Sequence, residues 1–100
     1  MNDRINVWVK EPGKGPKNKW IDNTLEGLQA AVNGYIETVT LADNIVAICN
    51  EEGRIRGMEP NCEICGIDFV GPIVIAGLQA DEFTDCPWDL DEMNYQFPQL

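Results

Sequence analysis

The apolar residues of this chain occur in short segments, and this feature restricts the fold more than any other. The longest purely apolar runs are residues 45–49 and 73–76, which are five and four residues long. A membrane-spanning helix needs about 20 apolar residues, so no transmembrane helix is expected. Short apolar runs bounded by glycine, proline and asparagine are typical of buried β-strands. The chain is therefore predicted to be rich in β-sheet.

The length and composition indicate one domain. The chain has 100 residues, of which 44% are apolar and 24% are charged. A chain of this kind can bury one hydrophobic core and needs no metal or disulfide to fold. The N-terminal Met-Asn-Asp-Arg leads into an alternating pattern and not into an apolar segment, so no secretory signal is expected. We expect a cytoplasmic protein.

The N-terminal segment is predicted to form a β-hairpin with a basic tip. Ile5, Val7 and Val9 alternate with other residues at the period of a half-buried strand. The sequence Pro-Gly-Lys-Gly-Pro at residues 12–16 is typical of a turn. Residues 17–21 are predicted to return as a strand at the sheet edge, where lysines discourage unwanted pairing.

One helix is predicted over residues 24–33. Asn23 is the expected N-cap, with Glu26 reaching back as in a capping box, and Gly34 is the expected left-handed stop. Apolar residues at helical spacing share the face expected to point into the sheet: Leu25, Leu28, Ala31 and Val32. The helix is too short to be stable alone, so it must pack on a sheet.

The rest of the chain is predicted to continue the sheet. Strands are expected at residues 35–41, 45–49 and 54–58, and at residues 69–78 with a bend at Gly71-Pro72. The predicted fold class is α+β: a single small domain with a mostly antiparallel or mixed sheet of four to six strands and one helix packed on one face.

We divide the chain into a compact domain at residues 1–80 and an acidic tail at residues 81–100. The tail has six acidic residues and no basic one. Five apolar residues are interleaved among them: Trp88, Leu90, Met93, Tyr95 and Phe97. We expect the tail to dock on the domain, with a helical turn starting near Pro87, because these side chains would otherwise lose their burial free energy.

Charge is unevenly distributed along the chain. Seven basic and 17 acidic residues give a net charge of −10. Residues 1–20 have five basic and two acidic residues, or +3, and residues 21–100 have two basic and fifteen acidic residues, or −13. This charge repels phosphate groups, so neither nucleic acid nor a membrane is an expected partner. It suits a basic partner protein, or it serves solubility alone.

The chain contains no histidine, which removes much of the catalytic repertoire. No Ser-His or Cys-His pair can form. The glycine-rich stretch at residues 13–16 is not a phosphate-binding loop, since Pro16 lacks an N–H and no strand-to-helix context follows. We predict a protein that is not an enzyme, with no catalytic residue and no cofactor.

The four cysteines pose the question of a metal site. Cys62 and Cys65 have the Cys-x-x-Cys spacing of a zinc knuckle, and Cys49 and Cys86 could complete a tetrahedron. Cys49 and Cys86 are isolated in the sequence, however, whereas a structural zinc site normally uses two Cys-x-x-Cys pairs. Free thiols are therefore the favoured interpretation, and a zinc-stabilised or redox module remains an alternative.

Two tryptophans and two lysines are the candidate partner-binding residues. Trp8 and Trp20 are out of phase with the inward-facing residues of their strands, so they lie on the face opposite the helix. Lys14 and Lys17 belong to the adjacent loop. If the tail docks, both tryptophans are expected in the core. If it does not, they mark an oligomer or partner interface.

Several stretches resemble a family of small proteins of unknown function from Gram-positive bacteria, their phages and conjugative elements. They are residues 7–13 (VWVKEPG), 21–29 (IDNTLEGLQ), 34–37 (GYIE), 49–53 (CNEEG), 60–61 (PN) and 71–75 (GPIVI). The resemblance covers about residues 5–85 and implies a single α+β domain carried on mobile DNA. Cys62 and Cys65 stand where that family has other residue types.

Three function classes are consistent with these observations. The resemblance implies a mobile-element accessory protein with a host-interaction or anti-defence role, and the charge favours binding of a host protein. The first alternative is a module that binds a small nucleotide-like signal with the basic loop and a neighbouring subunit. The second is a zinc or redox module built on Cys62 and Cys65. A homodimer is compatible with each of them.

Overall fold

The short apolar segments form strands, as their pattern predicts. A computed structural model describes residues 3–97. The strands are β1 (Arg4–Lys10), β2 (Lys17–Asp22), β3 (Ile36–Ala42), β4 (Ile45–Asn50), β5 (Pro60–Ile64), β6 (Ile67–Val70), β7 (Ile73–Gln79) and β8 (Glu82–Thr84). The helices are α1 (Leu25–Val32) and α2 (Leu90–Gln96). Neither helix of residues 3–97 has the length and apolar character of a membrane-spanning segment.

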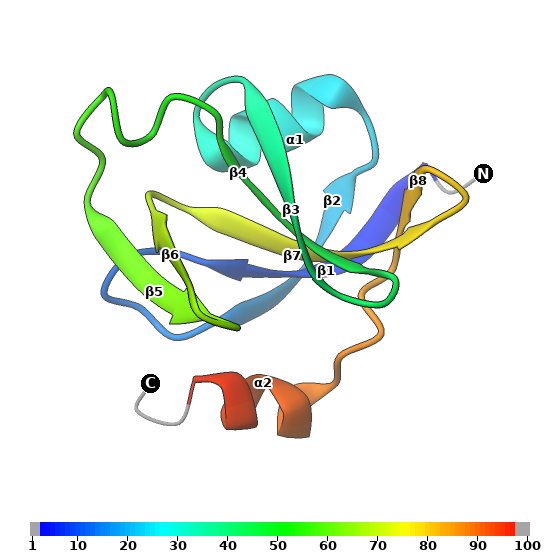
Figure 1. Cartoon of the computed structure of the whole chain (residues 1–100). Helices are drawn as coiled ribbons and strands as arrows, with labels where there is room; N and C mark the ends of the chain where they lie inside the picture. Colours follow the sequence, from blue (N-terminus) through cyan, green and yellow to red (C-terminus); the bar gives the residue numbers. More distant parts are fainter. Residues whose placement is uncertain (1–2, 98–100) are drawn as a thin grey trace.

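Six strands form the main sheet, and all its pairings are antiparallel. The order is β2-β1-β7-β4-β3, with β8 paired to β7. β5 and β6 form a separate two-stranded sheet. The predicted α+β domain with a sheet of four to six strands is confirmed. The expectation of one helix is incomplete, because α1 and α2 lie on opposite sides of the sheet (Figure 1).

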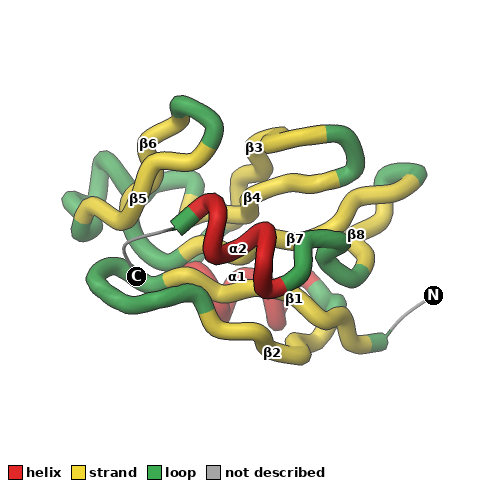
Figure 2. Tube along the Cα trace, turned by 90° about the horizontal axis from the view of Figure 1, so that it is seen from below, coloured by secondary structure: helices red, strands yellow, loops and turns green. Residues whose placement is uncertain are grey.

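The sheet has a core on each face. Between the sheet and α1, the strand residues Ile5, Val7 and Val9 pack with Leu28 and Val32 of the helix. On the opposite face the strands contribute Trp8, Ile45, Ala47, Cys49, Ile73 and Ile75, the β5–β6 hairpin contributes Ile64 and Phe69, and the C-terminal segment contributes Met93 and Phe97. Figure 2 shows α2 lying across β1 and β7. Both faces of the sheet are therefore covered.

The ends of α1 differ from the prediction. Thr24, not Asn23, is the N-cap, and its hydroxyl accepts the Gly27 N–H at 3.0 Å. Asn23 has other partners, because its backbone N–H donates to Asp3 and its side-chain amide donates to the carbonyl of Phe83. The left-handed residue that ends the helix is Asn33 with φ 63°, one position before Gly34. Asparagine tolerates this conformation.

A buried asparagine holds the C-terminal end of α1 on the sheet. Asn50, 5% exposed at the end of β4, donates its side-chain amide to the carbonyls of Val32 and Asn33 at 3.0 and 3.1 Å. The Arg56 guanidinium also donates to the Asn33 carbonyl, at 2.8 Å. These side chains satisfy carbonyls that a helix leaves without partners at its end.

The segment after β4 is not the strand expected at residues 54–58. Residues 51–57 form turns. The N–H of Met58, which follows them, donates to the Gly53 carbonyl at 2.9 Å. Gly57 has φ 68°, a left-handed conformation that does not occur in a continuous strand. We call residues 51–57 the arginine loop. The β5–β6 hairpin that follows turns at Cys65 and Gly66, which both have positive φ, as in a type I′ hairpin loop.

The C-terminal segment lies against the main sheet. β8 pairs with β7, and α2 begins after Asp89, whose carboxylate accepts the Glu92 N–H at 2.9 Å. The indole N–H of Trp8 donates to the Trp88 carbonyl at 2.9 Å. Met93 is fully buried. This segment therefore supplies the cover for the Trp8 side of the sheet.

Candidate functional site

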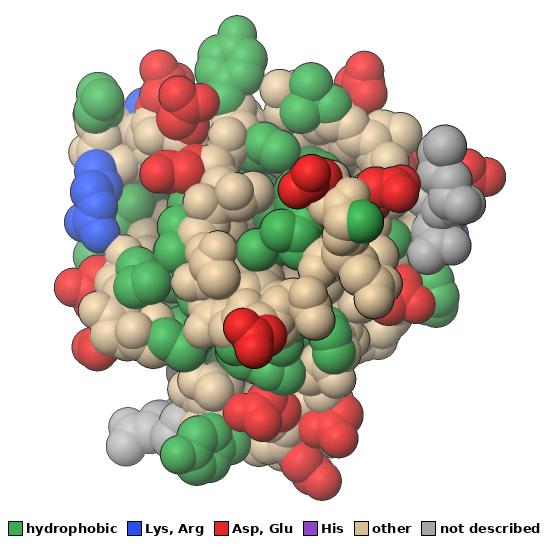
Figure 3. All heavy atoms as spheres, turned by 45° about the vertical axis from the view of Figure 1, so that its right-hand side comes forward, with side chains coloured by type: hydrophobic (Ala, Val, Ile, Leu, Met, Phe, Trp, Pro, Cys, Tyr) green, Lys and Arg blue, Asp and Glu red, His purple; other side chains and the backbone are tan. Residues whose placement is uncertain are grey.

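Acidic side chains dominate the surface. Every Asp and Glu in the described part of the chain is exposed except Glu11 and Glu92, which are half-buried. Figure 3 shows carboxylates spread over one whole face with few basic groups between them. Among residues 3–97 the single ion pair joins Arg4 Nε to Asp22 Oδ1 at 3.7 Å. Most carboxylates thus lack a cationic partner within the molecule.

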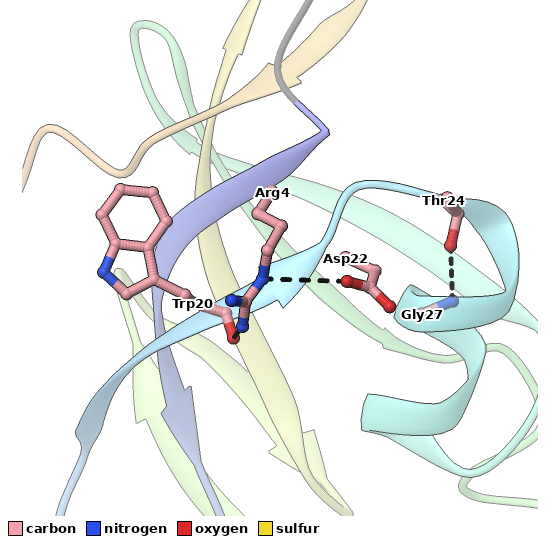
Figure 4. A network of polar contacts seen from close by, with 5 residues as sticks. All are labelled: Arg4, Trp20, Asp22, Thr24 and Gly27. Carbon is pink, nitrogen blue, oxygen red and sulfur yellow. Dashed lines mark hydrogen bonds and ion pairs between the residues drawn. The ribbon is translucent and has the colours of Figure 1, made fainter.

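The basic hairpin places Trp20 on an exposed sheet edge. β2 is the outer strand, as predicted, and Trp20 is 56% exposed. The Arg4 guanidinium donates to the Trp20 carbonyl at 3.0 Å and pairs with Asp22 (Figure 4). Lys14 and Lys17 are exposed at the same hairpin. These three predicted residues therefore lie on an accessible surface.

Trp8 has a different environment from Trp20. It is 8% exposed and packs in the core with Met93 and Phe97. The sequence allowed Trp8 either in the core or on a partner surface, and the structure places it in the core. Trp20 does not share this burial, so the expectation that a docked tail buries both tryptophans is wrong for Trp20.

The four cysteines are free thiols that differ in burial. Cys49 is buried, Cys62 and Cys86 are half-buried, and Cys65 is exposed. Within residues 3–97 no group of three or more cysteine or acidic side chains is placed to hold a metal ion. The alternative zinc site made of these four cysteines is therefore not assembled. Burial raises the pKa of Cys49, Cys62 and Cys86, which disfavours their reactive thiolate forms.

A hollow of about 400 Å³ lies between the β3–β4 pair, the arginine loop and β6. We call it the acidic hollow. Figures 1 and 2 both show the β5–β6 hairpin beside β3 and β4, which explains how segments distant in sequence meet there. Its floor consists of the buried or half-buried side chains Val39, Cys49, Ile67, Phe69 and Val70.

The rim of the acidic hollow is polar and mostly negative. It is formed by exposed side chains: Glu37 from β3, Glu51, Arg54 and Ile55 from the arginine loop, and Asp68 from β6. Three carboxylates and one guanidinium give the rim a net charge of −2. Ile55 is 89% exposed, the highest value among the exposed large apolar side chains of the described residues.

Local packing fixes the wall of the acidic hollow. Gly53 is buried, and a Cβ added to it would lie 2.9 Å from a methyl group of Val70. The arginine loop can therefore approach β6 closely only with glycine at this position. The Arg54 guanidinium donates to the Asp68 backbone carbonyl at 2.8 Å and joins the loop to the hairpin.

The charges of the acidic hollow affect the pKa of Cys49, the one cysteine among its lining residues. The pKa of Cys49 is raised first by burial and then by the negative charge of Glu37, and Arg54 opposes this shift. The carboxylates of Glu37, Glu51 and Asp68 make no ion pair among the described residues. The acidic hollow therefore offers an apolar floor and unpaired negative charge at its rim.

Sequence reasoning did not find this site. The segment Glu51-Glu52-Gly53 was interpretable only as a turn, and no motif connects it with Glu37 or Asp68. The one available signal was the apolar Ile55 between Arg54 and Arg56, in the segment that the sequence predicted as a strand.

The chain matches the model of one protein family over residues 5–97, and the family is described as a domain of unknown function (DUF3846). The chain belongs to this family. The predicted membership of a family of unknown function is thus confirmed, and the match includes both β8 and α2. No curated protein and no solved structure matches the chain.

Proposed function

We propose that this protein is a non-enzymatic accessory protein that binds a basic partner protein through the acidic hollow. The observation that carries this proposal is the combination, in one concave site, of a largely buried apolar floor with three unpaired carboxylates. Protein interfaces combine an apolar centre with a polar rim in the same way. The exposed Ile55 beside the carboxylates adds apolar area to that surface.

Charge selects the class of partner. The net charge of −10 disfavours phosphate-rich surfaces and attracts positively charged ones from a distance. A basic protein is therefore favoured over a nucleic acid or an anionic membrane. The absence of histidine from the sequence supports binding without catalysis.

The resemblance of the sequence to proteins of phages and conjugative elements supports a setting for this binding. We place the protein in the cytoplasm of a bacterial host, where it would act on a host protein in an anti-defence or other accessory role. Free thiols, with no disulfide among the described cysteines, agree with a reducing compartment.

Affinity capture from bacterial lysate at low ionic strength, with the purified protein immobilised, tests the proposal. The decisive variant neutralises the rim of the acidic hollow with Glu37→Gln, Glu51→Gln and Asp68→Asn, and we call it the hollow variant. We expect the wild type to capture a basic protein that added salt releases, and the hollow variant to lose it.

The matched control variant carries Asp43→Asn, Glu82→Gln and Asp91→Asn. These three residues are exposed and lie outside the acidic hollow, so the control changes the net charge by the same amount. The control variant is expected to keep the partner. Equal loss in both variants would show that total charge alone is responsible, and equal retention in both would contradict a role for the acidic hollow.

Native mass spectrometry of the purified protein tests the two alternative functions. A retained small molecule or a zinc ion would each add a characteristic mass to the chain. We expect the mass of the polypeptide alone, and any stoichiometric addition would favour the corresponding alternative.

A further inference from the structure

The geometry points to an arginine side chain of the partner as the group that enters the acidic hollow. This inference rests on the proposed function and adds the chemistry of the contact. A volume of about 400 Å³ is near the lower end of the range of roughly 300–1,000 Å³ found for ligand sites. Such a space suits one long side chain rather than a folded element.

The floor and the rim match the two parts of such a side chain. An arginine carries three methylene groups, which can lie on the apolar floor formed by Val39, Ile67 and Phe69. Its guanidinium would then reach the rim, where Glu37, Glu51 and Asp68 come from three different elements. The charges are complementary, because these carboxylates have no ion-pair partner among the described residues.

Arginine fits this arrangement better than lysine for two reasons. A guanidinium has five N–H donors in one plane and can contact carboxylates on several sides, whereas an ammonium has three donors at one point. A guanidinium is also more weakly hydrated than an ammonium, so it loses less hydration free energy when it enters a partly apolar site. The hollow already accommodates this group in its wall, where Arg54 donates to the Asp68 carbonyl at 2.8 Å.

The test is an NMR titration of the isotope-labelled full-length protein with three blocked peptides. Each peptide has five residues, with alanines around a central arginine, lysine or citrulline. Citrulline has nearly the shape of arginine without its charge. We expect the arginine peptide to shift amide signals of Glu37, Gly53 and Val70, and the citrulline peptide to bind at least about tenfold more weakly because charge-assisted hydrogen bonds are lost.

Two variants locate the effect. The hollow variant is expected to bind the arginine peptide about tenfold more weakly than the wild type, and the control variant is expected to bind it as the wild type does. The same spectra show whether each variant is folded. The peptide comparison on the wild type remains decisive if the hollow variant does not fold.

The following results would overturn the inference. Equal binding of the citrulline peptide would exclude recognition of the charge, and equal binding of the lysine peptide would exclude a preference for the guanidinium. Concentration-dependent shifts at the hollow without peptide would identify a second copy of the chain as its occupant. Shifts confined to other acidic segments, together with continued salt-sensitive capture of a basic protein, would refute the arginine contact and leave the proposed function standing.

Discussion

Lys10 departs furthest from the rule that charged side chains stay in water. Its side chain is 0% exposed. The ammonium donates to the Glu11 carbonyl and to Asn61 Oδ1, both at 2.9 Å, and lies 5.9 Å from the centre of the Phe97 ring. None of these partners is a carboxylate, so Lys10 is charged at a desolvation cost that hydrogen bonds only partly offset.

The burial of Lys10 predicts a specific pH dependence of stability. Burial lowers the pKa of Lys10 from its ordinary value of 10.5, and interaction with Cys62 opposes this shift. Between the lowered pKa and 10.5 the unfolded chain binds more protons than the folded chain, so this group makes stability rise with pH. We expect the free energy of unfolding of the wild type, relative to Lys10→Met, to rise as pH increases from neutral towards 10.5.

Urea unfolding of both proteins at a series of pH values measures this difference. The raised pKa values of Cys49 and Cys86 make stability fall with rising pH, but this contribution is shared by both proteins and cancels. Loss of Lys10 would raise the pKa of Cys62 further, which changes the difference in the expected direction. A difference that stays flat or falls with pH would show that Lys10 is not desolvated in solution.

At the scale of single residues, the sequence predicts which face of the sheet a side chain lies on better than it predicts whether another segment buries that side chain. Trp8 and Trp20 were predicted on one face, and the pairing of Trp8 with Asn18 and of Trp20 with Asn6 agrees with this. Their exposures differ because α2 covers β1 while β2 is the edge strand. Periodicity contains no information about which distant segment lies over a strand.

Among the elements, α1 provides a comparison of two leucines in one helix. Both were predicted to point into the sheet, but Leu28 is 3% exposed and Leu25 is 56% exposed. We expect Leu28→Ala to lower the free energy of unfolding by about 2–4 kcal/mol, since it leaves a cavity against Val46 and Val74. Leu25→Ala is expected to change it by less than about 0.5 kcal/mol. Equal effects in urea unfolding would contradict this orientation of the helix.

The C-terminal segment yields the second prediction about an element. Truncation after Asp85 removes Met93 and Phe97 from the core and breaks the hydrogen bond between the Trp8 indole and residue 88. We expect a lower urea midpoint and a smaller slope, because the folded state would bury less surface. Leu90→Ala is the control, since Leu90 is 60% exposed. An unchanged midpoint after truncation would mean that α2 does not hold to the sheet in solution.

Local pattern explains which elements the sequence predicts. β1, β2, α1, β3, β4 and the interruption at residues 71–72 each depend on periodicity or turn residues within the segment itself. The single bent strand expected at residues 69–78 is wrong, because the interruption divides it between β6 and β7, which belong to different sheets. The β5–β6 hairpin was not predicted because its strands have five and four residues, too few for a clear alternation. Its turn uses Cys65 and Gly66 instead of the more typical Asn-Gly. Residues of this hairpin line the acidic hollow, so the hollow could not be predicted from the sequence either.

For the whole molecule, the excess of negative charge is not compensated by ion pairs. The net charge is −10, and the Arg4–Asp22 pair is the single ion pair in the described part of the chain. The two side chains are 60% and 71% exposed, and a surface pair of this kind contributes at most about 1 kcal/mol. Attraction between charges therefore adds little to stability, whereas repulsion between carboxylates acts across the molecule.

This imbalance predicts that salt stabilises the folded protein. The molecule measures 34 × 30 × 21 Å, and electrostatic forces reach about 30 Å at roughly 0.01 M salt but only about 8 Å at roughly 0.15 M. At low salt most carboxylates therefore repel one another, and at higher salt only near neighbours do. We expect the urea midpoint to rise when the sodium chloride concentration is increased from roughly 0.01 M to roughly 0.15 M. The hollow variant, with three fewer carboxylates, should respond less than the wild type. A midpoint that falls with added salt would mean that attractive pairs outweigh repulsion, contrary to the exposed and unpaired carboxylates of this surface.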